Sequence, residues 1–547
     1  QIAAVYDHLR QDDPWSGFTI GIEDDVTFTS LPYQELRLEY PGQTACKIWG
    51  LGGDGTVGAN KNAITTIGLT AGKYAQAYFS YDSMKSGGLT QSHLRFGDEP
   101  IHATYLVSAA DFVGCHAPTY VEKYDTTEEL KDGGVYLLNC PWSPETLDAH
   151  LPAKMKRDLW KKHAAFYIID ATKIARELGL GGRINTILQA AFFQLTKVIP
   201  IDLAVEEMKR GNYNSYFKKG GREIVALNDR AVDAGLTGMI RVEIPDSWAN
   251  AEDAPAPEQA GTPFVKEIVV PMDRQQGDKL PVSLFKKHDC IDGTWENGTT
   301  AYSKRGVAVS VPRWDPDACI QCNRCAMVCS HAAIRPVLLT EEEQKQAPDT
   351  YVSVPAKGPG LGKYTFRMQV SPYDCLGCGV CLTACPAEGA LEMVPFETQK
   401  EQQANFDRFA MDETLLKKDA IHDKSVKNIQ FAKPYFQFSA ACAGCTETAY
   451  IKLVTQMFGD RMYVANASGC SSAYGGAMPM TPYARDSRGF GPCWEQSLFE
   501  DNAEFAYGFL RAHEAVHGGT GGPLGKRSPI TWNSGRTPRR PARPLTV

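Results

Sequence analysis

The chain has 547 residues, of which 43% are hydrophobic and 22% are charged, and its formal net charge is −7. This composition is ordinary for a soluble globular protein, and the length is enough for about three or four domains. The acidic balance gives no sign of nucleic-acid binding, no apolar run of about 20 residues exists to span a membrane, and the N-terminus lacks the features of a secretory signal. Sixteen cysteines without such a signal favour metal or redox chemistry in a reducing, cytoplasmic compartment over disulfides.

An alternation of strand-like and helix-like segments predicts an α/β domain with a mainly parallel sheet over residues 36–250. Residues 1–35, with a short strand at 18–23, are typical of the end of a preceding domain. The strands expected in the α/β domain are 47–51, 103–107, 135–139 and 165–170. The helices expected there include 171–178 and 184–198.

A glycine-rich turn follows the first of these strands and leads into a helix that begins at 59–61. Free N–H groups and the helix dipole at such a turn favour a phosphate group, although a plain tight turn is the alternative. The residues expected to contact a cofactor through its phosphate group are Gly50, Gly52, Gly53, Gly55, Asn60 and Lys61. Residues 53–55 also read Gly-Asp-Gly, but the Asn that completes a thiamine diphosphate motif does not follow, so we interpret this match as accidental. The loop at 82–88 suits either a second anion site or a solvated loop.

A stretch rich in Pro, Ala and acidic residues at 251–263 predicts a linker, and a small irregular domain extends from it, so that the two occupy 251–310. A ferredoxin-like α+β domain is expected over 311–395, interrupted by an insertion at about 338–366. Residues 396–430 are charged and are predicted to form a helical crossing segment.

The spacing C-x2-C-x2-C-x3-C occurs twice, in 319–329 and in 375–385, and it is the spacing of a bacterial two-cluster ferredoxin. In such a protein the fourth Cys of each run binds the cluster of the other run. The predicted ligands of one [4Fe–4S] cluster are Cys319, Cys322, Cys325 and Cys385, and those of the other are Cys375, Cys378, Cys381 and Cys329. Zinc is the alternative, but zinc sites usually use two separate C-x2-C pairs.

A third group of cysteines follows at Cys442, Cys445 and Cys470, in surroundings of small residues. With a fourth ligand these three side chains would hold a third cluster. The alternative is a redox dithiol at Cys442 and Cys445 with a packed Cys470.

Together these features resemble the pyruvate:ferredoxin (flavodoxin) oxidoreductases of the 2-oxoacid:ferredoxin oxidoreductase family, from residue 18 to about residue 507. Besides the cysteine motifs, the resemblance rests on strings that occur in the order of that family. They are WGLGGDGTVGANK at 49–61, SGG at 86–88, SHLRFG at 92–97, LPAKMK at 151–156, GGRIN at 181–185, GDKLPVS at 277–283, CAGC at 442–445, GCSS at 469–472 and DNAEF at 501–505.

The resemblance implies oxidative decarboxylation of pyruvate on thiamine diphosphate and Mg²⁺, transfer of the acetyl group to coenzyme A, and passage of electrons through three [4Fe–4S] clusters to ferredoxin or flavodoxin. It implies that Cys442, Cys445 and Cys470 bind the cluster nearest the thiamine and that Glu447 is the acidic, catalytic residue beside that site. It also implies that 36–250 is the coenzyme A side, that 431–510 begins a thiamine diphosphate-binding α/β domain, and that the complete enzyme is a homodimer.

The sequence also departs from the family pattern. Ala440 and Thr446 stand where the family has Gly, the N-terminal domain is missing, and residues 511–547 form a divergent basic tail. We therefore expect the fourth ligand of the third cluster and the thiamine diphosphate motif to lie outside this chain, and we do not expect it to turn over alone. An iron–sulfur electron-transfer module, or a related enzyme for 2-oxoglutarate, remains as an alternative.

Overall fold

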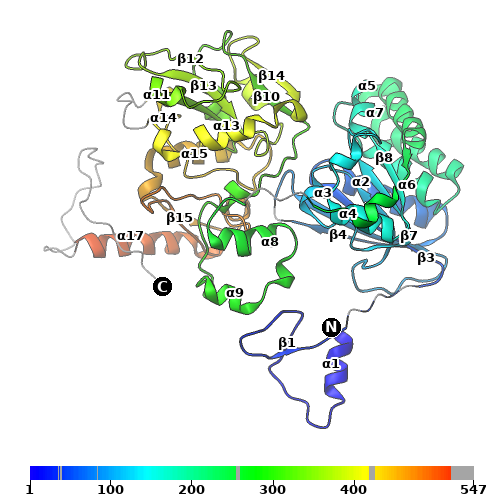
Figure 1. Cartoon of the computed structure of the whole chain (residues 1–547). Coiled ribbons are helices and arrows are strands. Elements are labelled where there is room, and N and C mark those ends of the chain that lie inside the picture. The colour runs from blue at the N-terminus through cyan, green and yellow to red at the C-terminus, as the bar shows by residue number, and fades with distance from the viewer. Residues whose placement is uncertain are drawn as a thin grey trace. The chain divides into compact units, whose positions relative to one another are not determined.

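The computed structural model describes residues 1–518 except 35, 37, 39, 83, 254–258 and 418–424 (Figure 1). It divides into two compact units. The first comprises Gln1–Met462 and Gly469–Cys493, and the second comprises Tyr463–Ser468 and the chain from Trp494 onward. No described helix is both long enough and apolar enough to cross a membrane.

A seven-stranded sheet forms the centre of the α/β domain, in the order β4-β5-β3-β6-β7-β8-β9. Its strands are β3 Gln43–Leu51, β4 Tyr74–Tyr81, β5 Leu89–Gly97, β6 Ala110–Cys115, β7 Leu130–Asn139, β8 Ala165–Ile169 and β9 Ile240–Val242. The central strands β3, β6, β7 and β8 are parallel, whereas β4, β5 and β9 pair antiparallel at the two sides. The expected α/β domain is therefore confirmed, with a parallel centre and antiparallel borders.

Both faces of this sheet are buried. Successive residues of β3 point to opposite faces, so Ile48 enters one hydrophobic core and Trp49 enters the other. The first core is completed by helices α2, α5, α6 and α7, and the second by α3 and α4. These helices are α2 Thr56–Thr65, α3 Tyr120–Lys123, α4 Ala153–Lys161, α5 Ala171–Glu177, α6 Asn185–Thr196 and α7 Ile201–Thr237.

The strand expected at 103–107 is wrong, because these residues form a loop and the strand begins later, at Ala110. Side chains of β4 and β5 hold this loop: Gln76 donates to the carbonyl of Ala103 at 2.6 Å, and Arg95 donates to the carbonyl of Leu106 at 3.0 Å. Because side chains bond these two carbonyls, the carbonyls need no partner on a neighbouring strand.

The N-terminal segment contains α1 Ile2–Leu9 and the paired short strands β1 Thr19–Ile20 and β2 Ser30–Leu31. The small domain after the linker contains α8 Val270–Asp273 and α9 Val282–Lys287. A hydrophobic cluster around Phe264 and Ile268 forms its core and also includes Met480. Asp25 accepts a hydrogen bond from the backbone of Ser283 at 2.8 Å, which joins these two parts of the chain.

The ferredoxin-like region is built from an antiparallel pair of strands, a three-stranded sheet and two short helices that follow the cysteine loops. Its elements are β10 Ser310–Trp314, α10 Arg324–Val328, β11 Ile334–Leu339, α11 Glu341–Gln344, β12 Val354–Pro355, β13 Thr365–Val370, α12 Val380–Thr383 and β14 Leu391–Pro395. The insertion at about 338–366 thus supplies α11 and the edge strand β12.

The crossing segment contains α13 Gln402–Phe409 and α14 Val426–Ile429. It leads to α15 Thr446–Phe458 and α16 Cys470–Gly475 in the first unit. The second unit includes β15 Tyr463–Asn466 and α17 Asn502–Gly518, with β16 Cys493–Gln496 at the boundary. The expected tail boundary at 511 falls inside α17, and the tail from 519 onward lies outside the described residues.

Candidate functional site

The two cysteine loops have the same backbone conformation. Gln321 and Asn323 adopt positive φ angles of 58° and 59°, and Gly377 and Gly379 adopt 67° and 73° at the matching positions of the second loop. The backbone N–H groups of Gln321 and Gly377 lie 3.4 Å from the sulfur of the first Cys of each loop. Each loop therefore curls around its own sulfur atoms and directs an N–H group at one of them, as a loop that binds anionic thiolates requires.

The fold brings the cysteines together in the crossed arrangement that the spacing predicts. A cavity beside the first loop is lined by Cys319, Cys322, Cys325 and, from the second run, Cys385. Burial raises the pKa values of the Cys375 and Cys381 thiols, and the nearby thiol of Cys329 raises both further. The two sites adjoin each other, since Cys325 and Cys381 also interact electrostatically.

In the described residues, no three His, Cys, Asp or Glu side chains are close enough together to hold a single metal ion. A four-iron cube binds each thiolate to a different iron, so it needs wider spacing than a tetrahedral zinc ion does. Two adjoining groups of four cysteines, the first of them around a cavity, therefore fit two cubes better than two zinc ions.

The Cys442–Cys445 loop lies directly against the second ferredoxin loop. A Cβ atom added to Gly444, which has a φ of 72°, would lie 3.1 Å from Cγ2 of Val380 and 4.0 Å from the sulfur of Cys378. The backbone N–H of Ala443 donates to the hydroxyl of Ser86 at 3.0 Å. The loop is thus held between the α/β domain and the site that contains Cys378.

Glu447 lies in the first turn of α15, which begins directly after Cys445, where the helix dipole favours a carboxylate. Its carboxylate accepts a hydrogen bond from the hydroxyl of Tyr474 at 2.9 Å. Burial raises the pKa of Tyr474, and Glu447 raises it further. Tyr474 belongs to α16, whose first residue is the exposed Cys470. In the described part of the chain, Cys470 makes no bond to Cys442 or Cys445. It is connected to this site through Tyr474, which lies on the same helix and bonds to Glu447.

The glycine-rich turn between β3 and α2 leaves backbone donors free. Gly53 and Gly55 have φ angles of 91° and 90°, and their N–H groups have no acceptor among the described residues. Gly52 donates its N–H to the carbonyl of Gly88 at 2.7 Å, so the turn packs on the 82–88 loop. The turn keeps the features of an anion cradle, whereas the amide of Asn60 is buried and donates to Ser92 at 2.8 Å, and the ammonium of Lys61 lies over the ring of Phe79.

Asp54 holds this turn in shape. Its carboxylate accepts from the N–H of Leu51 at 3.0 Å, from the N–H of Thr56 at 2.7 Å and from the Thr56 hydroxyl at 2.8 Å. Replacing Asp54 by alanine is expected to lower the free energy of unfolding by about 1–3 kcal/mol, because these donors lose their acceptor. Urea unfolding measures the change, and Asp54→Asn, which keeps one acceptor oxygen, should lose less. Equal stability of the alanine variant and the parent would contradict this role.

Residues 304–307 of the small domain contact both cysteine-bearing regions and the α/β domain. Arg305, which is 7% exposed, donates to the carbonyls of Ser86 at 3.2 Å and Ser439 at 3.1 Å. Gly306 donates its N–H to the carbonyl of Tyr373 at 2.8 Å, just before the second cysteine loop. Val307 lies so close to Gly87 that a Cβ there would approach it to 2.7 Å. This short segment thus joins three parts of the site that are distant in sequence.

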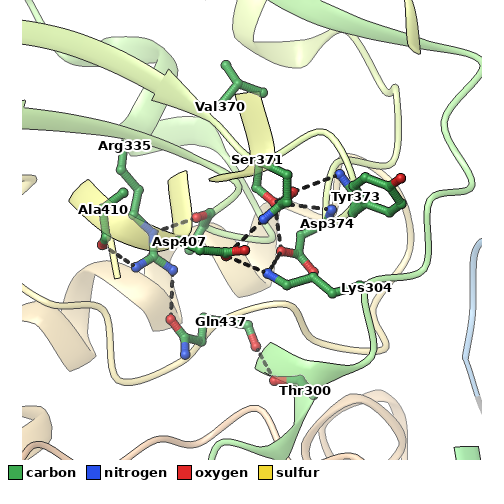
Figure 2. Close-up of polar contacts among 12 residues, drawn as sticks. Thr300, Lys304, Arg335, Val370, Ser371, Tyr373, Asp374, Asp407, Ala410 and Gln437 are labelled. Atoms are coloured by element: carbon green, nitrogen blue, oxygen red, sulfur yellow. Dashed lines mark hydrogen bonds and ion pairs between the residues drawn. The ribbon is translucent and has the colours of Figure 1, made fainter. Parts of the chain in front are cut away.

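The ammonium of Lys304 lies between two carboxylates, at 2.8 Å from Asp374 and 3.0 Å from Asp407 (Figure 2). Figure 2 also shows Arg335, which donates to the carbonyl of Ala410 at 3.3 Å and to the side chain of Gln437 at 2.7 Å. Asp374 directly precedes Cys375, so this network holds the start of the second cysteine loop. Sequence reasoning missed Lys304, Arg305 and Arg335, because their partners are not near them in the sequence.

Three family models match the chain. A model described as pyruvate ferredoxin/flavodoxin oxidoreductase matches residues 45–238, a domain of unknown function matches 250–308, and a 4Fe-4S dicluster domain matches 318–390. The α/β domain is thus matched by an oxidoreductase model, and the region of the two crossed cysteine sites is matched by a 4Fe-4S model.

Curated relatives match almost the whole chain. A pyruvate-flavodoxin oxidoreductase of Klebsiella pneumoniae is 49% identical over 519 residues, which are 94% of this chain and 44% of that protein. A pyruvate:ferredoxin oxidoreductase of Moorella thermoacetica is 49% identical over 515 residues, 93% of this chain and 43% of that protein. A mitochondrial pyruvate dehydrogenase (NADP+) of Euglena gracilis is 43% identical over 93% of this chain, and the match covers 28% of the Euglena protein. The chain is thus homologous to a segment of these oxidoreductases and spans less than half the length of the relatives.

Proposed function

We propose that this chain is the electron-carrying segment of an enzyme that oxidises pyruvate. The overall reaction converts pyruvate and coenzyme A to acetyl-CoA and CO₂ and releases one proton and two electrons. The contact between Gly444 and Cys378 carries this proposal, because it puts the Cys442–Cys445 loop, with Glu447 beside it, next to the crossed cysteine sites. A simple electron-transfer module would not need a third cysteine group with a carboxylate at its side.

The contacts also support an order for the three cysteine groups. Iron–sulfur clusters, when bound, accept and release single electrons. The group at Cys442 and Cys445 adjoins Cys378, and the group containing Cys378 and Cys381 adjoins Cys325. The site of Cys319, Cys322, Cys325 and Cys385 is then the last of the three, and the exposed Ile320 in its loop is next to where an electron acceptor would dock.

We propose that the complete enzyme binds thiamine diphosphate with Mg²⁺, which supplies the carbanion chemistry for the release of CO₂. Glu447 is the candidate acidic residue beside that cofactor, and Tyr474 orients its carboxylate. The free N–H groups of the turn at 50–55 and the adjacent Gly88 loop support a phosphate contact, for which coenzyme A is the candidate.

Ferredoxin or flavodoxin is the proposed acceptor, since relatives named for both are 49% identical to this chain. The relative named for NADP+ is less similar, at 43%. We also propose a homodimeric enzyme in the cytoplasm. The sixteen cysteines support a reducing compartment, because none forms a disulfide.

The test uses the complete protein that contains this chain, reconstituted anaerobically with iron and sulfide. Residues 319–385 are expected to bind about eight iron and about eight sulfide ions, with the absorbance of iron–sulfur charge transfer. Pyruvate is expected to reduce a viologen dye only when coenzyme A is present, and 2-oxoglutarate is expected to give much slower reduction. A protein that binds only zinc, or that prefers 2-oxoglutarate, would overturn the corresponding part of the proposal.

A further inference from the structure

Lys452 is a buried lysine in the middle of α15. It is 2% exposed, and its neighbours on the buried face of the helix include Thr448, Thr455 and Gln456. Its ammonium donates to the backbone carbonyl of Ala326, and to that of Met327 at 3.2 Å. A lysine is almost never fully buried unless it is paired, so its charge needs an explanation.

No carboxylate among the described residues forms an ion pair with Lys452 or is a source of its electrostatic shift. The two cations of Figure 2 differ in this respect, because Lys304 and Arg335 both interact with the carboxylates of Asp374 and Asp407. Burial lowers the pKa of Lys452 to about 8, and the groups that oppose this effect are the sulfur atoms of Cys329 and Cys325. A buried charge without a counter-charge is costly, so the anion that offsets Lys452 should lie at these cysteines.

The position of the two carbonyls is informative. Ala326 and Met327 lie in α10 between Cys325 and Cys329, which in the crossed arrangement belong to different sites. The ammonium is therefore close to one ligand of each site at once. Because four thiolates make a cube anionic, and reduction adds another negative charge, a fixed cation here favours the reduced state of both.

We propose that Lys452 is the shared counter-cation of the two ferredoxin-like clusters and raises the reduction potentials of both. This inference rests on the proposed function, since it requires that Cys325 and Cys329 bind iron–sulfur clusters. Lys452 acts through the ligands and touches neither substrate nor cofactor, so it is a positioning and tuning residue.

The experiment compares the parent enzyme with Lys452→Gln, Lys452→Met and Lys452→Arg, using redox titrations of the reconstituted complete protein followed by electron paramagnetic resonance. Gln keeps a donor for the carbonyls but carries no charge, Met has neither, and Arg keeps the charge. At a fixed applied potential, the ratio of reduced to oxidised cluster should be about tenfold lower in the Gln and Met variants than in the parent, for both clusters. This change corresponds to a midpoint potential that is lower by about 59 mV for a one-electron couple. The Arg variant should return toward the parent value. Lys345→Met, which removes a lysine directly after α11 whose side chain is 68% exposed, is the matched control and should leave both midpoints unchanged.

The outcomes separate this inference from the proposed function. A Gln or Met variant with full iron content and parental midpoints would overturn the role of Lys452 and leave the proposed function intact. If Gln and Met lose iron while Arg keeps it, the charge is needed to hold the clusters, which supports the inference. Loss of iron in all three variants would mean that only packing matters, and the inference would fail. A parent protein that binds no iron would refute the proposed function itself.

Discussion

Cys329→Ala is expected to remove the cluster of the second cysteine loop, which Cys375, Cys378 and Cys381 would hold together with Cys329. This is expected although Cys329 is next to the first loop in sequence. The reason is geometric, because the thiol of Cys329 lies beside those of Cys375 and Cys381. The iron bound to residues 319–385 should fall from about eight to about four per chain. Iron and sulfide analysis measures the loss, and the spectrum of the remaining cluster identifies which one survives.

Cys385→Ala is the mirror-image variant and should remove the cluster of the first loop, whose cavity Cys385 lines. Cys290→Ala is the matched control. Cys290 is a buried cysteine outside both runs, and its thiol donates to the carbonyl of Phe285 at 3.2 Å. Loss of the first-loop cluster in the Cys329 variant would show that the ligands are not crossed.

The arrangement of the cysteines was predictable from the sequence because it depends on local geometry. Left-handed residues at 321, 323, 377 and 379 let each loop curl around its sulfur atoms, and the three-residue gap before Cys329 or Cys385 allows a helical turn that carries the fourth sulfur away. The same locality explains why the strands near 135–139 and 165–170 were predicted correctly, since their apolar runs are bounded by turns.

The features that escaped prediction depend on contacts between distant segments. Residues 103–107 are apolar enough for a strand, yet Gln76 and Arg95 of another part of the sheet hold their backbone in a loop. Lys452 and Glu447 are the two charged residues of α15, and only the fold reveals that Lys452 faces the carbonyls of α10. Sequence periodicity reports which side of a helix is buried, but it does not report what lies opposite.

Removing Lys304 of the small domain is expected to be among the most destabilising single changes at its contact with the ferredoxin-like region. Its ammonium lies 2.8 Å from the carboxylate of Asp374, whose side chain is only 3% exposed, and 3.0 Å from Asp407 (Figure 2). Lys304→Met leaves the buried carboxylate of Asp374 without its nearest cation. Breaking a fully buried pair typically costs about 3–5 kcal/mol, and this is the upper bound here because the side chain of Lys304 is 27% exposed. Urea unfolding of the reconstituted protein measures the loss.

Two further variants and a pH series test the cause. Adding Asp374→Asn to Lys304→Met should recover part of the lost stability, because the uncompensated charge is then gone. Arg313→Ala, which breaks the exposed pair with Glu392, should cost less than about 1 kcal/mol.

The pH dependence of this stability follows from the pKa of Lys304. Burial disfavours the charged form of Lys304, but the carboxylates of Asp374 and Asp407 outweigh the effect of burial and raise the pKa of Lys304. The stability that Lys304 provides should therefore be fully present below its unfolded pKa of about 10.4 and decline only as the pH rises through the higher folded value. A stability difference between parent and variant that changed between about pH 6 and pH 9 would show that another group carries the effect.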